Sequence, residues 1–465
     1  MAKYDLIVIG SGPGGEKAAI QAAKLDKKVM VVERRETPGG SSLHTGTIPS
    51  KTLRESVRFI GLIKKRAVYG ISVHLDRNVT VDRLMHRKNT AIADLSERLE
   101  TTFERNDIDL VRGVATFVDE HTIAVNPVNG GSGREGPETH TGEKIIIAPG
   151  SRPYRPDDVD FNHPRVLDSD TVLALHQIPR TLTIIGAGVI GCEYATLFAN
   201  LGVKVNLVNP RQVLLDFLDL EISNSLGYLM RDQGVRIRLG EVLSEVKTDD
   251  EHVYAHMESG KIIKSEYLLY ANGHSGNTEE LALDKVGLQV NKRNQLEVND
   301  FYQTEKPHIY AVGDVIGFPS LASTSMEQGR LASLHAFGEL DKKPREDLIP
   351  TGIYTIPEIS MVGATEEQLT RQKIPYEVGS ANFREIARGQ IVGNTTGRLK
   401  LLFHRESLKL LGVHVMGDYA TDLVHIGQTV MAFDGTIEYF ITTVLNYPTY
   451  SECYRVAALN GINRL

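Results

Sequence analysis

Gly10-Ser11-Gly12-Pro13-Gly14-Gly15 is the stretch that decides the fold of the amino-terminal part of this chain. It follows a short apolar run, 4–9, that is rich in β-branched residues and that we expect to form a strand. Residues 16–28 then have helical spacing, and 29–32 form a second apolar strand that ends at Glu33. The glycines permit a tight turn and a close approach of backbone to a pyrophosphate, which the N–H groups of the helix N-terminus would stabilise. This unit predicts a dinucleotide site in which Glu33 accepts hydrogen bonds from a ribose diol.

The same unit occurs a second time. Residues 180–185 form an expected strand, Gly186-Ala187-Gly188-Val189-Ile190-Gly191 follows, and a helix leads to a strand over 203–208 that ends at Asn209. Asn209 stands as far from the first glycine of its unit as Glu33 does from Gly10. The chain is therefore expected to hold two dinucleotide sites.

The residues after the second unit bear on which nucleotide binds there. An acid at this position repels a 2′-phosphate, whereas a nearby arginine accommodates one. Asn209 is neutral and Arg211 follows two residues later. We expect this site to admit both NAD(H) and NADP(H), with Arg211 attracting the 2′-phosphate. The alternative for Arg211 is a solvated surface arginine without a role.

Gly39-Gly40-Ser41-Ser42-Leu43-His44-Thr45-Gly46-Thr47-Ile48-Pro49-Ser50-Lys51 leads from the first unit into a helix that we expect from Ser50 to about Ala67. This stretch resembles the redox helix of the flavoprotein disulfide reductases, the family of lipoamide dehydrogenase, glutathione reductase and mercuric reductase. In that family two cysteines form the redox-active pair, where this chain has Ser42 and Thr47. Neither hydroxyl can form a disulfide, so the framework is kept while the dithiol is missing.

Further stretches carry the same resemblance. Residues 306–314 resemble the family's second flavin signature, whose aspartate, here Asp314, bonds the ribityl chain. A helix beginning near Ala322 would direct its N-terminus at the flavin ring and stabilise the reduced anion. Residues 144–153 resemble the segment that leaves the flavin domain, and 267–273 resemble the segment by which the chain returns to it.

The C-terminal part resembles the family's interface domain. That domain ends in a His-Pro-Thr sequence and a glutamate, and its histidine reaches the active site of the partner subunit. Here the stretch is Asn446-Tyr447-Pro448-Thr449-Tyr450-Ser451-Glu452, so Tyr447 takes the place of the histidine and Glu452 is kept. The remaining histidines of this region are scattered and expected to be structural: His404, His414 and His425.

The resemblance covers essentially the whole chain and implies an α/β protein with two Rossmann-like dinucleotide-binding domains and an α+β C-terminal dimerisation domain. The expected divisions are 1–152 for the FAD-binding domain, 153–273 for the NAD(P)-binding domain, 274–344 for the second part of the FAD-binding domain, and 345–465 for the interface domain. The implied assembly is a homodimer or a larger homo-oligomer.

Residues 46–51 and 446–449 resemble the transhydrogenase branch of this family. This implies FAD as cofactor and a ping-pong hydride exchange between NADPH and NAD⁺ at one nicotinamide site. Lys51 and Glu193 would pair beside the flavin and are the expected catalytic residues. Other residues are expected near the cofactors by resemblance: Arg34, Gly39, Gly40, Ser41, Ser42, Ala115, Gly150, Ser151, Val189, Ile190, Gly273 and Tyr447.

Two other functions stay open at this point. An NAD(P)H oxidase or quinone reductase of the same fold would pass its electrons to oxygen or a quinone. A flavin-loaded scaffold dimer would hold a flavin that NAD(P)H does not reduce.

Composition limits the remaining classes of function. The chain has 465 residues with 41% hydrophobic content, enough for about three domains. Its net charge of −7 argues against nucleic acid as a partner, and no apolar run approaches the roughly 18 residues of a membrane span. The start of the chain leaves no room for a signal peptide before the first strand. Cys192 and Cys453 lack metal-ligand spacing, so we expect buried thiols, a reducing cytoplasmic setting and no metal site.

Overall fold

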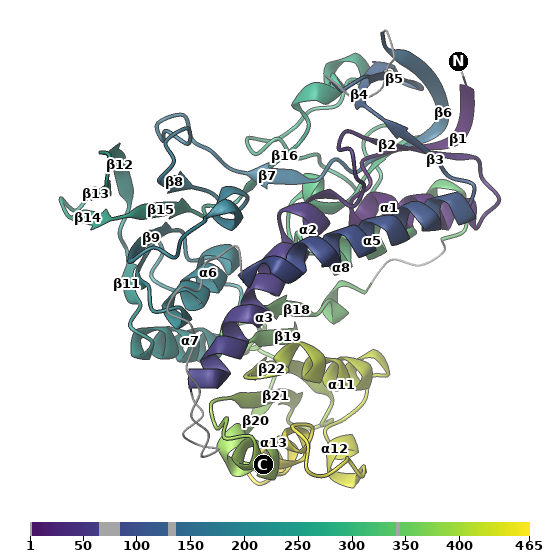
Figure 1. Ribbon diagram of the computed structural model, residues 1–465. Coiled ribbons are helices and arrows are strands. Elements are labelled where there is room, and N and C mark those ends of the chain that lie inside the picture. Colours follow the sequence, from purple (N-terminus) through teal and green to yellow (C-terminus); the bar gives the residue numbers. More distant parts are fainter. Residues whose placement is uncertain (1, 65–83, 129–135, 341–344) are drawn as a thin grey trace.

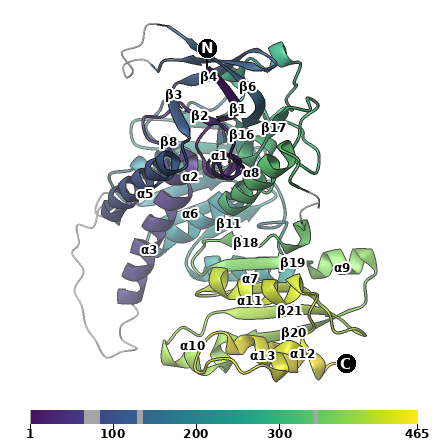
Figure 2. The ribbon, with the colours of Figure 1, turned by 90° about the vertical axis from the view of Figure 1, so that its right-hand side faces the viewer.

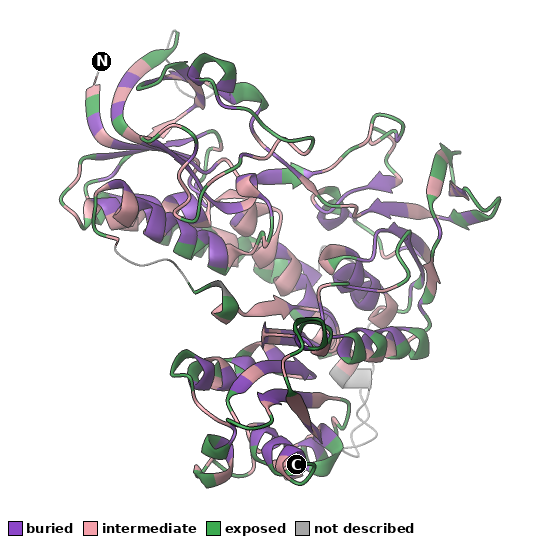
Figure 3. Cartoon of the chain, turned by 180° about the vertical axis from the view of Figure 1, so that it is seen from behind, coloured by how far each residue is buried: buried purple, intermediate pink, exposed green. Residues whose placement is uncertain are grey.

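The computed structural model describes residues 2–64, 84–128, 136–340 and 345–465. Figure 1 shows the first sheet near the N-terminus and the last sheet near the C-terminus, with a second Rossmann-like unit beside them. Buried residues concentrate in the strands and in the helix faces that pack on them (Figure 3). The predicted α/β fold class is confirmed.

The first sheet has the strand order β3-β2-β1-β6-β5-β4, and β17 pairs with β6. Parallel pairing places β1 between β2 and β6, so the carboxyl ends of these strands share one edge. Because β17 also pairs in parallel with β6, a segment far along the chain returns to this sheet. The strands are β1 (Ala2–Ile9), β2 (Val29–Glu33), β3 (Asp109–Arg112), β4 (Val114–Asp119), β5 (Thr122–Asn126), β6 (Glu138–Ile147) and β17 (Ile309–Ala311).

Two helices pack closely beneath this sheet, α1 (Pro13–Ala23) and α8 (Ala322–Ala336). A Cβ added to Gly329 would lie 2.0 Å from the carbonyl oxygen of Gly14, so only glycine permits this approach. Ser333 Oγ donates to the carbonyl of Ala18 at 2.7 Å. The packing brings the N-terminus of α8 next to the first glycine loop.

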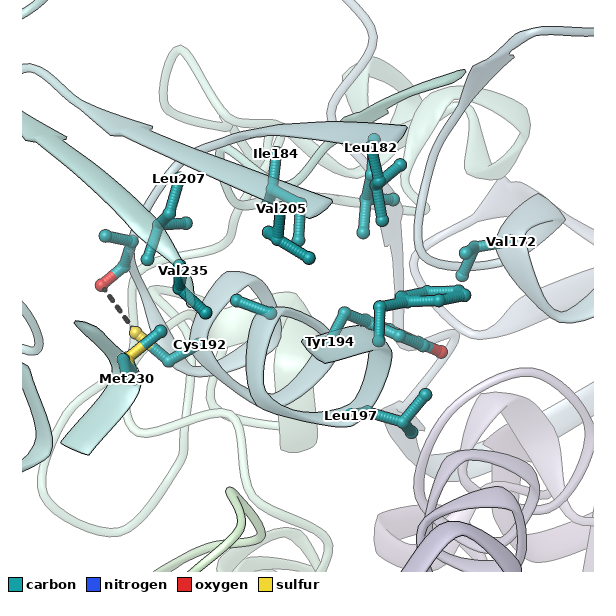
Figure 4. Close-up of a cluster of buried hydrophobic side chains, with 14 of the residues drawn as sticks. Val172, Leu182, Ile184, Cys192, Tyr194, Leu197, Val205, Leu207, Met230 and Val235 are labelled. Carbon is teal, nitrogen blue, oxygen red and sulfur yellow. Dashed lines mark hydrogen bonds between the residues drawn. The ribbon is translucent and has the colours of Figure 1, made fainter. Parts of the chain in front are cut away.

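The second sheet is parallel, in the order β11-β10-β9-β15-β8. Its core packs on one side against α6 (Val189–Asn200), where Cys192 lies among aliphatic side chains (Figure 4). A short antiparallel sheet of three strands follows α7 (Leu220–Asp232) and β11. The strands are β8 (Val166–Leu167), β9 (Thr181–Ile185), β10 (Lys204–Asn209), β11 (Arg236–Leu239), β12 (Leu243–Thr248), β13 (Val253–Met257), β14 (Ile262–Ser265) and β15 (Tyr267–Tyr270).

The first and second sheets are linked by β7 (Ser151–Pro153) and β16 (His274–Gly276), which pair antiparallel. Strand β7 lies in the segment that was expected to leave the flavin domain, and β16 directly follows the segment that was expected to return to it. Short helical turns complete this region: η2 (Thr171–Ala174), η3 (Glu279–Leu281), η4 (Leu283–Val286) and η5 (Gly313–Ile316).

The third sheet is antiparallel, in the order β18-β19-β22-β21-β20. Figure 2 shows the yellow helices α11 and α13 against it. They touch through Tyr454, whose hydroxyl donates to the carbonyl of Leu423 at 2.7 Å. The elements are η6 (Glu346–Leu348), β18 (Thr351–Ile353), β19 (Ile359–Gly363), α9 (Glu366–Gln372), β20 (Tyr376–Asn382), η7 (Phe383–Glu385), α10 (Ala387–Ile391), β21 (Arg398–His404), β22 (Leu410–Met416), α11 (Ala420–Ala432), α12 (Glu438–Thr442) and α13 (Glu452–Ile462).

Helix α3 (Thr47–Lys64) follows α2 (Gly40–His44) and runs from the first sheet toward the third (Figure 1). The end expected near Ala67 lies outside the described residues. The other long helix is α5 (His86–Arg105). None of the described helices is long and apolar enough to span a bilayer.

Three boundaries differ from the sequence expectations. Helix α1 begins at Pro13 rather than at residue 16, because proline suits the first helical turn, and it ends at Ala23 before a turn at Asp26 with φ of 57°. Residues 126–143, whose glycines and prolines favour a loop between strands, include the start of β6, which pairs with β5 from Glu138 onward. The pattern of residues 50–110 favours a mainly helical region, but β3 begins at Asp109, where it pairs with β2.

Candidate functional site

The first glycine loop is shaped by close backbone contacts. Gly10 has φ of 99°, and a Cβ there would lie 2.3 Å from the carbonyl oxygen of Ala148. A Cβ on Gly15 would lie 1.9 Å from the carbonyl oxygen of Gly10, which forces the helix against the strand. At Gly12 the nearest heavy atom to such a Cβ is 3.8 Å away, so the loop is open there. This shape fits the pyrophosphate of a dinucleotide.

Glu33 lies buried at the end of β2 and anchors this loop. Its Oε2 accepts the backbone N–H of Ser11 at 3.1 Å, and its Oε1 accepts that of Arg35 at 2.8 Å. Ser11 Oγ also donates to Glu33 and accepts the N–H of Gly39 at 3.0 Å. Ser11 thus joins the first glycine loop to the Gly39-Gly40 pair. The sequence did not predict this role, because a serine between glycines belongs to no recognised pattern. Arg34 is half-exposed and lies 3.5 Å from Glu280.

A second set of groups gathers where α8 begins. Ser151 Oγ donates to Asp314 Oδ2 at 2.8 Å, so two predicted residues from different segments meet. The N–H of Gly313 donates to Gln328 Oε1 at 2.8 Å. Helix α8 starts at Ala322, as predicted, and no side chain caps it. Its first N–H groups and its dipole are therefore available to stabilise an anion.

The predicted ion pair between Lys51 and Glu193 is present. Lys51 Nζ on α3 lies 2.7 Å from Glu193 Oε2 on α6, and both side chains are largely buried. Glu193 Oε1 accepts the backbone N–H of Tyr354 at 2.9 Å. The Tyr354 ring centroid lies 5.0 Å from Lys51 Nζ. Burial raises the pKa of the Tyr354 hydroxyl, and the partly negative face of its ring attracts the ammonium.

Tyr354 was not among the predicted site residues. It begins the connection between β18 and β19, which contacts helices from the other two parts of the fold. Arg54 on α3 forms an ion pair of 2.9 Å with Glu358, and Ile356 N–H donates to Thr196 Oγ1 on α6 at 3.1 Å. All three parts of the fold therefore meet at the Lys51–Glu193 pair.

Ser42 and Thr47 occupy α2 and the first turn of α3, beside the same region. The two cysteines of the chain lie elsewhere; both are free and buried, as predicted. Burial raises the pKa of the Cys453 thiol to about 12. Tyr447 is 71% exposed on this protomer, so its predicted approach to a flavin depends on a second subunit and stays a prediction.

The second glycine loop repeats the geometry of the first. Gly186 has φ of 104°, and a Cβ there would lie 2.7 Å from the carbonyl oxygen of Ala271. A Cβ on Gly191 would lie 1.9 Å from the oxygen of Gly186. Nothing lies within 4 Å of a Cβ on Gly188. Val189 and Ile190 open helix α6, whose N-terminus faces this space.

Asn209 lies buried at the end of β10, and its amide is committed to the protein. Its Nδ2 donates to the carbonyls of Arg211 and Val213 at 3.3 and 3.0 Å, and its Oδ1 accepts the N–H of Ala187 at 3.4 Å. Arg211 is 67% exposed and pairs with Asp216. The structure thus places Arg211 in the loop after β10, where the adenosine end of a nucleotide binds in such folds.

The remaining predicted positions are also defined. Ala115 is buried in β4; Gly150 and Gly273 have positive φ and open space where a Cβ would be. The histidines named from the sequence have hydrogen-bond partners within residues 345–465. His414 is buried, which lowers its pKa, and its Nε2 contacts the carbonyl of Ala364, while His404 and His425 are bonded to residues within three positions.

One acidic group in the described part of the chain has the spacing of metal ligands: Asp219, Glu221 and Glu366. Lys400 Nζ lies between them, 2.8 Å from Asp219 and 3.1 Å from Glu221, and it also bonds Glu366. Because Lys400 is fully buried among these carboxylates, the group is an ion-pair cluster that joins α7 to the third sheet.

Comparison with known proteins agrees with this geometry. Residues 4–329 match the family model described as pyridine nucleotide-disulphide oxidoreductase, and residues 349–458 match the dimerisation domain of that family. The chain belongs to the pyridine nucleotide-disulphide oxidoreductase family. It is thus an oxidoreductase, and the dimerisation domain indicates a homo-oligomer.

Family members with similar sequences and structures include curated and solved proteins. The soluble pyridine nucleotide transhydrogenases of Enterobacter sp. (strain 638) and Shigella flexneri are 52% and 51% identical to the chain, over 99% of it and 98% of each relative. The HOCl-induced flavoprotein disulfide reductase RclA from Escherichia coli has a TM-score of 0.87 at 26% identity, covering 98% of this chain and 99% of its own. LpdA from Mycobacterium tuberculosis shares the fold, with a TM-score of 0.90 at 24% identity and coverage of 99% of both chains. Family membership implies a flavin and nicotinamide nucleotides.

Proposed function

We propose that this protein is an FAD-dependent transhydrogenase that exchanges hydride between NADPH and NAD⁺ by a ping-pong mechanism at one nicotinamide site. The names of the two relatives at about half identity support this assignment. The main support is that the chain keeps the flavin-side and nucleotide-binding groups but lacks the groups of disulfide chemistry. The Lys51–Glu193 pair and both glycine loops are intact, whereas Ser42, Thr47 and Tyr447 replace the groups that a disulfide reductase needs.

FAD, rather than another flavin, is supported by the first loop. The open space at Gly12 beside the N-terminus of α1 suits a pyrophosphate, and buried Glu33 suits an adenosine ribose. Asp314 and Ser151 would hold the ribityl chain, and the uncapped N-terminus of α8 would face the ring. When bound, FAD supplies the hydride chemistry, because it can accept a hydride from one nicotinamide and donate it to another.

The protein groups act by position and charge. Lys51 places a cation on the flavin side of the pocket, and Glu193 fixes its direction while balancing its charge. The N–H of Tyr354 holds the other oxygen of Glu193, and its ring confines the ammonium on a second side. This arrangement orders the pocket edge against which a nicotinamide ring would stack.

The residues of the loop after β10 suit a single site that binds both nucleotides in turn. Asn209 carries no charge to repel a 2′-phosphate, and Arg211 offers an exposed guanidinium to it. The first product leaves before the second nucleotide binds, so the same residues act in both halves of the exchange. We further propose that the active form is a cytoplasmic homodimer in which Tyr447 approaches the partner's flavin.

Initial rates at varied NADPH and a nicotinamide analogue test the assignment. Parallel double-reciprocal lines are expected, since the first product leaves before the acceptor binds. Intersecting lines would show that both nucleotides bind at once. Fast reduction of a quinone or oxygen without NADPH-dependent reduction of NAD⁺ would instead identify an NAD(P)H oxidase or quinone reductase.

A further inference from the structure

We infer that Asp216 is a specificity-determining residue: it holds Arg211 in an ion pair and thereby restrains the affinity of the second nucleotide site for a 2′-phosphate. The inference rests on the proposed function only in taking the loop after β10 as a nucleotide site. It adds a residue that no sequence pattern indicated.

Two hydrogen bonds hold the backbone of Arg211, while its side chain extends into solvent and forms an ion pair. The carbonyl of Arg211 accepts Nδ2 of Asn209 and the N–H of Gly240, each at 3.3 Å. The guanidinium is 67% exposed and bonds the carboxylate of Asp216, which is 46% exposed. The loop thus presents the guanidinium at the end of β10 and occupies it with an internal anion.

Within residues 209–213, Arg211 has the charged side chain that could bind a phosphate. Both amide hydrogens of Asn209 are already donated to the carbonyls of Arg211 and Val213. A 2′-phosphate would therefore share this guanidinium with Asp216, whose negative charge opposes the phosphate. NAD(H), which has a ribose hydroxyl in this place, carries no such phosphate and gains nothing from Arg211.

The expected size of the effect is modest. An exposed ion pair is worth little because water and salt screen it, and the phosphate also experiences the nearby negative charge of Asp216. Removing the carboxylate should tighten binding of a 2′-phosphorylated ligand by about twofold to fivefold, and it should leave ligands without that phosphate unchanged. Asp216 thereby keeps the affinities of one site for NADP(H) and NAD(H) closer together.

The test measures binding to the oxidised holoenzyme by calorimetry, at one fixed ionic strength. The probes are adenosine 2′,5′-bisphosphate and adenosine 5′-monophosphate, which differ by the 2′-phosphate and carry no nicotinamide. The variants are Asp216→Asn, Arg211→Ala and the double variant. Asp232→Asn is the matched control, because it removes the same charge from an exposed position at the end of α7.

Asp216→Asn should tighten only the bisphosphate, Arg211→Ala should weaken only the bisphosphate, and the double variant should match Arg211→Ala. Asp232→Asn should change neither ligand by more than the measurement error. Unchanged or weaker bisphosphate binding in Asp216→Asn would overturn the inference, and so would a gain that persists without Arg211. Failure of both probes to bind any variant would refute the nucleotide site as well. Because neither probe can accept hydride, a protein that lacks transhydrogenase activity could still give the expected pattern.

Discussion

Replacing Glu193 with glutamine should slow reduction of the flavin without unfolding the protein. The amide oxygen can still accept the N–H of Tyr354, which now lies 2.9 Å from Glu193 Oε1. The amide nitrogen would then face Lys51, 2.7 Å from the present position of Oε2, so the ammonium loses its counter-charge and a charge-assisted hydrogen bond.

A hydrogen bond to a charged group contributes about 1.5–3 kcal/mol, and the pair is largely buried, so little screening by water reduces that value. If this contribution is realised in the rate-determining state, the rate constant for flavin reduction by NADPH falls by about 10- to 100-fold. Anaerobic stopped-flow absorbance at the flavin band measures this rate constant directly. The spectrum of the oxidised flavin and the thermal midpoint report whether the fold is kept.

Glu55→Gln is the matched control, because it removes the same charge from the same helix as Lys51, at a side chain that is 58% exposed. It should leave the rate within about twofold of the parent. Equal rates for Glu193→Gln and the parent would refute the view that this carboxylate orders Lys51 for the reaction. Equal losses in both variants would mean that overall charge, not position, sets the rate.

Four other outcomes are expected. Glu33→Arg should purify with less FAD per chain, measured by absorbance, because a cation would replace the acceptor that holds the first loop; full occupancy would argue against this placement. Arsenite should not inhibit, because it requires paired thiols and the two cysteines lie in different core clusters. Thiol reagents should not react before unfolding, because both thiols are buried; rapid titration of the native protein would contradict this. Lys400→Met should lower the free energy of unfolding by about 3–5 kcal/mol in urea titrations, since it leaves buried Asp219 without its cation; a loss under 1 kcal/mol would disagree. Truncation before Asn446 should loosen both the oligomer and FAD in size-exclusion chromatography, and a fully active monomer would count against the proposed role of the tail.

Much of the fold could be predicted from the sequence because its signals are local. Gly10 and Gly186 open strand–turn–helix units in which a Cβ would collide with backbone, so these positions require glycine. Glu33 and Asn209 end their strands as expected. The predicted boundaries of α1 and β6 were wrong, because the helix end depends on a turn at Asp26 and the strand start depends on pairing with β5.

The site was predicted in part. Lys51 and Glu193 were named by resemblance, and they meet although they are 142 positions apart. Tyr354 was missed because it bonds Glu193 through its backbone N–H, and every residue type except proline has this group. Asp216 was missed because an ion pair between exposed side chains follows no periodic pattern. The domain divisions and the contacts of each residue with FAD stay predictions.

The most direct test of the central claim is one anaerobic stopped-flow experiment in two stages. NADPH is mixed with the oxidised holoenzyme until the flavin band is bleached, and the reduced protein is then mixed with NAD⁺. The proposed function predicts fast bleaching without a long-wavelength thiolate band, followed by return of the flavin absorbance and formation of one NADH per flavin. A flavin that NADPH reduces but NAD⁺ cannot reoxidise would contradict hydride exchange between the two nucleotides.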